Sequence, residues 1–291
     1  TVEIKAAVPR GKAMDWIVWY LSTATDNSSY QVYDCQCKQS EQCRIEFRSE
    51  NPEDPVIIVA ISYSQKYFSN TAKLAILIED FGFQADQTTI EYLSFPEPLT
   101  VSLVPSKKLS SWTAQIANEY KKEITIILPL DPLPVSVKTY KSDVIMVHYP
   151  EEKIRGLIQE STSLIPNFAG FTNMNGIKVT QDSRVMQIII DEMKKRKAYF
   201  VASDLTQLSV VPELVRELRI PYSAVKGTID SNAGKEEIEN QLRKYAGAAQ
   251  KSGSMLIRSD PSDVFIKVLK EMLPELKKNG VRLAYVSEIV T

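Results

Sequence analysis

The stretch LAILIEDFG (residues 74–82) decides the fold, because an apolar run of strand length ends there in two adjacent carboxylates. Those carboxylates, Glu79 and Asp80, stand just before a turn at Gly82. A continuous apolar run that ends at a turn is typical of a strand buried on both faces of a parallel sheet. Paired acids at the end of such a strand indicate a functional site, or the remains of one.

Outward from this stretch, strands alternate with amphipathic helices toward the C-terminus. The segments expected to be strands are LAILIED, LTVSLVP, ITIILPL, NFAGFTN, AYFVAS, YSAVKG, SMLIRS and VRLAYVSEI. Alternation over about 220 residues requires parallel strands, arranged as a doubly wound sheet or as a barrel. The chain contains neither GxGxxG nor GxxxxGK[ST], which argues against a nucleotide-binding sheet. The sequence therefore predicts an α/β fold over residues 67–291 and favours a barrel-like closure of its seven or eight strands.

Residues 1–66 follow another pattern and predict a small accessory α/β domain with the element order β-α-β-β-β. Its helix, GKAMDWIVWYLSTAT, carries apolar residues at helical spacing. Trp16 and Trp19 stand beside them, and we expect this aromatic face to pack in the core. The segment QKYFSNTAK (residues 65–73) is expected to link the two domains.

The composition gives no support for several classes of partner. With 35 basic and 36 acidic residues, the net charge is −1, which gives no reason to expect a nucleic acid or an anionic membrane surface. No apolar run approaches the roughly 20 residues that span a bilayer. The chain begins at Thr1 without a signal-like segment, so any targeting segment is expected to be missing from this sequence.

The three cysteines lie close together in CQCKQSEQC (residues 35–43). Without a nearby histidine they fall one ligand short of a structural zinc site. A cross-strand disulfide from Cys43 to Cys35 or to Cys37 would leave one odd thiol. The alternative is three reduced cysteines in a small sheet.

Polar residues follow several of the predicted strands, and in a barrel the carboxyl ends of the strands meet at one rim. The candidate site residues there are Glu79, Asp80, Asp131, Asn173, Asn175, Asp204, Arg258 and Asp260. Asp80 and Asp131 would ligate a metal if a hard-cation site survives, Glu79 is the candidate catalytic base, and the other five would bind a ligand. A structural role is the alternative for Asp131 and Asp260, since each precedes a proline, where aspartates commonly start turns.

Several segments resemble, in order, the motifs of the divergent polysaccharide deacetylases. They are LAILIEDFG, ITIILPLDP, IPNFAGFTNMNGIKVT, YFVASDLT and the C-terminal segment from GSMLIRSDP to SEIV, within residues 72–290. The resemblance implies the irregular (β/α) barrel of the metal-dependent carbohydrate deacetylases. It also implies a periplasmic or otherwise extracytoplasmic location and an association with the cell envelope.

The chain departs from that pattern at its metal-binding positions. Glu79 replaces the first acid of an Asp-Asp pair, Ile127 replaces the histidine of His-Leu-Pro, and Met174 that of Asn-Asn-His. Late in the chain, IRSDP replaces Gly-His-Pro. The resemblance implies one Asp and two His around a zinc-like ion, yet the whole chain holds one histidine, His148, outside every matching motif. We therefore expect no cofactor, with a divalent cation in an all-oxygen site around Asp80 as the alternative.

Three hypotheses follow from the sequence. The leading one is a catalytically degenerate deacetylase-like protein that binds an envelope glycan or a protein partner, with Phe81, Phe83 and Phe171 as candidate aromatic contacts. The second is an active metal-dependent carbohydrate deacetylase with a rewired site, which requires strand 74–80 to bend, because successive side chains of a strand point to opposite faces. The third is an interaction protein that accepts a partner strand on the edge of its small sheet.

Overall fold

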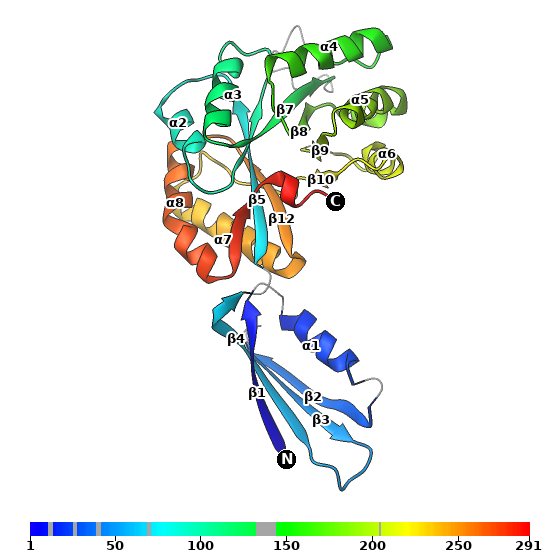
Figure 1. The fold of residues 1–291 in the computed structure, drawn as a ribbon, viewed down its shortest axis with the longest axis vertical. Helices are drawn as coiled ribbons and strands as arrows, with labels where there is room; N and C mark the ends of the chain where they lie inside the picture. Colours follow the sequence, from blue (N-terminus) through cyan, green and yellow to red (C-terminus); the bar gives the residue numbers. More distant parts are fainter. Residues whose placement is uncertain (11–13, 26–27, 39–41, 69–70, 132–143, 204) are drawn as a thin grey trace. The chain divides into compact units, whose positions relative to one another are not determined.

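The computed structural model describes two compact units (Figure 1). The described residues are 1–291 except 11–13, 26–27, 39–41, 69–70, 132–143 and 204. One unit comprises Thr1–Lys73 together with Ala246–Ser254 and Leu273–Arg282, and the other comprises the remaining residues. The domain boundary expected after residue 66 stays a prediction.

The first unit contains a four-stranded sheet with the predicted β-α-β-β-β order of elements. Its elements are β1 (Val2–Arg10), α1 (Met14–Thr23), β2 (Tyr30–Lys38), β3 (Gln42–Ser49) and β4 (Ile57–Phe68). The strand order is β1-β4-β3-β2, in which β1 runs parallel to β4 and the other two pairs are antiparallel. Because β4 continues to Phe68, the prediction that residues 65–68 belong to a linker is wrong.

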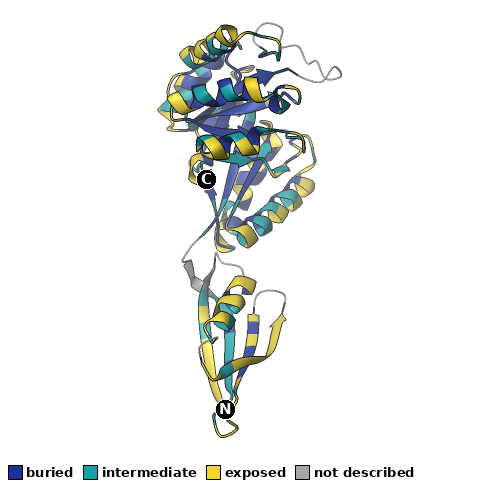
Figure 2. Ribbon diagram, turned by 90° about the vertical axis from the view of Figure 1, so that its right-hand side faces the viewer, coloured by how far each residue is buried: buried dark blue, intermediate teal, exposed yellow. Residues whose placement is uncertain are grey.

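The core of this sheet is one-sided. Its buried members are Met14, Ile17, Cys43, Ile45, Phe47 and Ile61. Trp16 and Trp19 are 42% and 59% exposed, so the prediction that they pack in the core is wrong. A helix that packs on a small sheet buries a single stripe, and here the stripe is filled by the aliphatic residues. Edge strand β2 is exposed along almost its whole length (Figure 2).

A disulfide joins Cys37 of β2 to Cys43 of β3. The two cysteines stand directly opposite each other in the antiparallel pair. Cys35 is a free, exposed thiol on the same strand, and burial raises its pKa, as does the neighbouring charge of Asp34. The structure thus selects one of the two pairings that the cysteine spacing left open.

The barrel is a nine-stranded sheet in the order β10-β9-β8-β7-β6-β5-β12-β11, with β13 paired to β5. The strands are β5 (Ala72–Phe81), β6 (Thr100–Leu103), β7 (Glu123–Leu130), β8 (Gly170–Asn175), β9 (Tyr199–Ala202), β10 (Tyr222–Ala224), β11 (Gly227–Thr228), β12 (Ser254–Ser259) and β13 (Val281–Ala284). The pairs from β5 to β10 are parallel, as the alternation of strands and helices predicts. The predicted irregular (β/α) barrel is confirmed.

One segment joins the two edges of this sheet. The predicted single strand YSAVKG is divided into β10, which pairs with β9, and β11, which pairs with β12. Between them, Val225 donates its backbone N–H to Ala202 at 2.9 Å, and Lys226 donates to Leu256 at 3.0 Å. The chain therefore passes from one edge of the sheet to the other, and successive residues of the connection are hydrogen-bonded to β9 and to β12.

The helices lie around the outside of the curled sheet (Figure 1). They are α2 (Gln87–Leu93), α3 (Ser110–Glu119), α4 (Glu151–Leu164), α5 (Ser183–Lys195), α6 (Val211–Leu218), α7 (Lys235–Ser252) and α8 (Asp263–Lys278). Asp86 and Asp182 cap α2 and α5 by accepting backbone N–H groups of the first turn. Among the described residues, no helix combines the length and the apolar character that crossing a bilayer requires.

A buried carboxylate ties α4 to α5. Glu192 of α5 is 5% exposed and forms ion pairs with Lys195 at 2.7 Å, with Arg196, and with Arg155 of α4. Burial alone would raise the pKa of Glu192, but hydrogen bonds from Lys195, Arg196 and Arg155 lower it to about 2. The network therefore holds this acid in its charged form across the physiological range of pH.

Candidate functional site

Inward-facing side chains of three strands form layers along the barrel. Ala75 and Leu77 of β5 pack with Tyr199 and Val201 of β9 and with Leu256 of β12. Because side chains on one face of a strand recur every second residue, the next layer toward the carboxyl ends consists of Glu79, Ser203 and Arg258. The apolar layers thus lead into a polar layer at the predicted rim.

Glu79 is held within this polar layer by contacts to both of its carboxylate oxygens. The Ser203 hydroxyl donates to Oε1 at 2.7 Å, and the Arg258 guanidinium lies 3.4 Å from Oε2. The Ser203 backbone N–H donates to Asn173 Oδ1 at 3.0 Å, and Thr172 Oγ1 lies 2.9 Å from the Ser203 hydroxyl. The structure therefore brings together three of the predicted site residues, Glu79, Asn173 and Arg258.

The strand breaks its regular pattern at Asp80. The pairing of β5 with β6 shifts register between Ile78 and Phe81, and Asp80 adopts a left-handed backbone with a φ of 61°. Such an irregularity at the end of a strand re-aims the side chains around it. At Gly82, which has a φ of 103°, a Cβ atom would lie 2.3 Å from the Ser110 hydroxyl, so this turn requires glycine.

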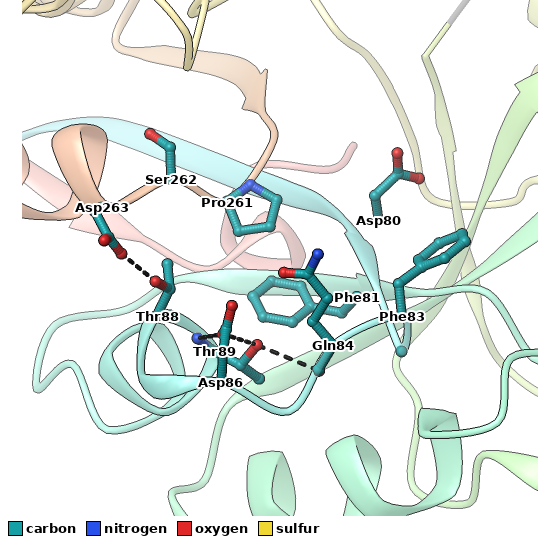
Figure 3. A pocket seen from close by; sticks show the side chains of 11 residues that line it. Asp80, Phe81, Phe83, Gln84, Asp86, Thr88, Thr89, Pro261, Ser262 and Asp263 are labelled. Atoms are coloured by element: carbon teal, nitrogen blue, oxygen red, sulfur yellow. Dashed lines mark hydrogen bonds between the residues drawn. The ribbon is translucent and has the colours of Figure 1, made fainter.

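Asp80 lines a cavity of about 560 Å³ (Figure 3). The other lining residues are Phe81, Gly82, Phe83, Gln84, Asp86, Thr88, Thr89, Pro261, Ser262 and Asp263. Asp80 and Phe83 lie at one end of it, and Asp86 and Asp263 lie at the other. The hydrogen bond from the Thr89 backbone lowers the pKa of Asp86, while Asp263 accepts the Thr88 hydroxyl, so both of these acids support the local fold.

The three candidate aromatic residues differ in their exposure. Phe81 and Phe171 are 2% and 0% exposed and belong to the core. Phe83 is 45% exposed, and Lys107 Nζ lies 4.8 Å from the centre of its ring. Phe81 and Phe83 both line the cavity, and of the two Phe83 has the exposed ring.

The remaining predicted site residues are dispersed. Asp131 is 7% exposed, lies 3.7 Å from Lys178 Nζ and, within the described part of the chain, is not among the residues that line the cavity. Asp260 is exposed in the turn after β12. Asn175 belongs to β8, but its side chain lies outside the described part of the structure, as does the whole of Asp204.

The described donors do not fit a zinc-like ion. Among them, no group of three His, Cys, Asp or Glu side chains is placed to hold a metal together. Asp131 is paired with Lys178 and Glu79 with Arg258, so two of the rim carboxylates face cations that the chain itself supplies. His148 is exposed beside the start of α4, where its ring meets that of Tyr149 edge to face.

Ser203, Thr172 and Lys107 contact site residues but were not among the candidate site residues. Ser203 and Thr172 complete the polar layer around Glu79, and Lys107 lies beside Phe83. The position of Ser203 at the end of a predicted strand was a usable signal. The role of Lys107 depends on how two loops pack, which no local pattern reports.

Comparison with known proteins identifies the class to which this barrel belongs. Residues 76–290 match the divergent polysaccharide deacetylase family, and the chain belongs to that family. The uncharacterized protein YibQ of Escherichia coli is 22% identical over 204 residues, which cover 70% of this chain and 63% of YibQ. The chain thus spans less than two thirds of the length of that relative.

The fold also matches a solved structure. The crystal structure of an uncharacterized protein of Agrobacterium tumefaciens C58 superposes with a TM-score of 0.70 at 17% identity. The match covers 76% of this chain and 90% of the other. At that identity, the likeness shows a shared fold and nothing further.

Proposed function

We propose that this chain is a catalytically degenerate member of the divergent polysaccharide deacetylases whose cavity at the end of β5 binds an envelope glycan. The observation that carries the proposal is the engagement of both Glu79 oxygens, one by Ser203 and one by Arg258. A general base must reach the attacking water at hydrogen-bond distance. A carboxylate already occupied by an arginine and a serine is poorly placed for that role.

The cavity has the attributes of a sugar site. Its volume of about 560 Å³ lies within the usual range for small-ligand pockets, and an exposed aromatic ring stands beside polar groups. The ring of Phe83 offers an apolar surface for the C–H face of a sugar, while Asp80, Gln84 and Thr88 offer hydrogen-bond partners for hydroxyl groups. Asp80, predicted as a metal ligand, is in this proposal a ligand-binding residue.

An extracytoplasmic location forms part of the proposal. The Cys37–Cys43 disulfide supports it, because disulfides form and persist in oxidising compartments and are rare in the cytosol. The test is alkylation of thiols in intact cells that express the full-length protein, before any lysis. Labelling of Cys35 alone is the expected result, and labelling of all three cysteines would contradict it.

The first experiment tests for catalysis. Zinc, nickel, manganese and magnesium are each titrated by calorimetry into metal-stripped protein and into Asp80→Ala, and acetate release from acetylated glycans is assayed with each metal. No metal binding up to millimolar concentration and no acetate release are expected. Metal-dependent acetate release that is lost in Asp80→Ala would instead support the active hydrolase with an all-oxygen site.

The second experiment tests for binding. A panel of soluble oligosaccharides is titrated into the full chain, into Phe83→Ala and into Tyr120→Ala, which removes another exposed aromatic ring as a matched control. Because an aromatic contact contributes about 1 kcal/mol beyond its buried area, Phe83→Ala should weaken binding about fivefold. Tyr120→Ala should leave it unchanged. Failure of every oligosaccharide to bind would overturn the glycan proposal and favour a protein partner.

A further inference from the structure

A second cavity, of about 390 Å³, lies beside the first at the carboxyl ends of the strands. It is lined by Pro105, Ser106, Lys107, Lys108, Ser111, Pro129, Leu157, Glu160, Ser161 and Leu164. Its residues come from the loop after β6, from the first turn of α3, from β7 and from α4. The lining contains two lysines and one carboxylate, so it carries a net positive charge, in contrast to the acidic lining of the first cavity.

The two cavities meet at Phe83 and Lys107. Phe83 lines the first, Lys107 lines the second, and the ammonium lies 4.8 Å from the centre of the ring. Backbone hydrogen bonds fix the two loops together, since Leu109 donates to Gly82 at 3.2 Å and Val104 donates to Phe81 at 3.3 Å. The cavities are therefore adjacent compartments that share one wall.

The basic character of the second compartment is reinforced by its helix. Leu109 at the N-terminus of α3 provides no side-chain cap, and no acidic residue stands in the first helical turn. The positive end of the helix dipole consequently adds to the charges of Lys107 and Lys108, and the last turn of α4, which contributes Ser161 and Leu164 to the lining, offsets part of this effect. A neutral sugar would use neither the dipole nor the lysines, whereas a carboxylate would use both.

We propose that the two cavities form one groove for a polysaccharide that carries carboxylate groups. One sugar ring lies against Phe83 with its hydroxyls toward Asp80, and the carboxylate of a neighbouring sugar lies against Lys107 and Lys108. This inference rests on the proposed glycan binding and adds the class of glycan. The charges act mainly on specificity, because complementary charges at an exposed site select among ligands more than they add affinity.

The test compares two ligands that differ in charge and in the methyl groups that remove it. Oligogalacturonate and its fully methyl-esterified, neutral form are titrated by calorimetry into the full chain at low salt. The acidic oligomer should bind about tenfold more tightly, since two exposed ion pairs contribute up to about 1 kcal/mol each. Raising the salt concentration should remove this preference and leave the neutral ligand unaffected.

Variants of the lining residues test whether the preference for the acidic oligomer arises in the groove. The double variant Lys107→Gln with Lys108→Gln should lose the preference for the acidic oligomer and keep the affinity for the neutral one. Lys194→Gln with Lys251→Gln removes two exposed lysines from other helices and should change neither affinity. Phe83→Ala should weaken both ligands, because the ring contacts the sugar face whatever its charge.

The outcomes separate the two proposals. Equal binding of both ligands, insensitive to Lys107 and Lys108 but weakened by Phe83→Ala, would overturn the anionic groove and leave the proposed function standing. An equal loss of affinity in the control lysine variant would also overturn it, since the preference would then reflect overall charge. Absence of binding by either ligand, and by every oligosaccharide of the wider panel, would overturn both proposals.

Discussion

The four-stranded sheet of residues 1–68 and the barrel bury their strands to different extents. In β2 only the first residue is even partly buried, and β1 is exposed at most of its described positions. In the barrel, β6 and β9 are buried at every position, and β7 at all but its first. A sheet covered by one helix has one face and its edges exposed to solvent. A sheet that curls on itself and is surrounded by helices has both faces covered and its edges close together.

The two regions consequently use different means of stabilisation. The small sheet joins its exposed edge strand to its core strand with the Cys37–Cys43 disulfide. The barrel pairs charged groups, with Glu79 and Arg258 at the end of an inner layer and with Glu192 and Arg155 between helices α5 and α4. The disulfide thus restrains an edge strand that buries little surface, whereas the Glu192 and Glu79 pairs place cations against two largely buried carboxylates.

The largest effect is expected from removing the buried negative charge of Glu192. Glu192→Gln should lower the free energy of unfolding of the barrel by about 3 kcal/mol, because it removes the buried carboxylate that Arg196, Lys195 and Arg155 share, although Arg155 keeps a second acidic partner in Glu151. Hydrogen exchange of the amides in α4 and α5 measures the loss. The exchange rates of the amides in β1 to β4 should not change.

The same network has a defined dependence on pH. Because the pKa of Glu192 is lowered from 4.5 to about 2 in the folded protein, its contribution is present above pH 4.5 and is lost as the pH falls toward 2. The difference between wild type and Glu192→Gln should shrink over that interval. Glu160→Gln, an exposed acid on α4, serves as the control, and an equal loss of stability there would contradict the assignment.

A smaller effect is expected from reduction of the disulfide. Its six-residue sequence separation closes a short loop, so reduction should destabilise the four-stranded sheet by about 2 kcal/mol. Faster amide exchange in β2 and β3, with no change in β5 to β9, would bear this out. Cys35→Ser should have no effect, and a loss of protection in the barrel on reduction would show that the regions are not independent.

The smallest effect concerns the strained end of β5. Asp80→Gly should raise the free energy of unfolding above that of Asp80→Ala by about 1 kcal/mol, because glycine adopts the left-handed backbone without strain. Thermal unfolding of both variants measures the difference. Both should lose affinity for glycan oligomers, and equal stability of the two would show that the backbone at this position stores no strain.

Much of the barrel could be predicted from local pattern. The apolar run before Glu79 and the alternation of strands and helices predicted parallel strands, and the predicted rim correctly placed Glu79 near Arg258. The prediction of burial failed where it depends on how large a surface the sheet offers to the helix packed on it. Trp16 and Trp19 carry the apolar character of core residues, yet the small sheet buries only one stripe of their helix.

The sequence by itself determined the family, the order of elements and the presence of a single histidine, because each of these follows from residue identity and spacing. Only the tertiary structure decided which carboxylates remain at a cavity. Glu79 and Asp80 are adjacent in the chain, but the shift in β5 places the first in the barrel layer with Arg258 and the second on the cavity wall. Ion pairs and cavities form between residues distant in sequence, so no local pattern encodes them.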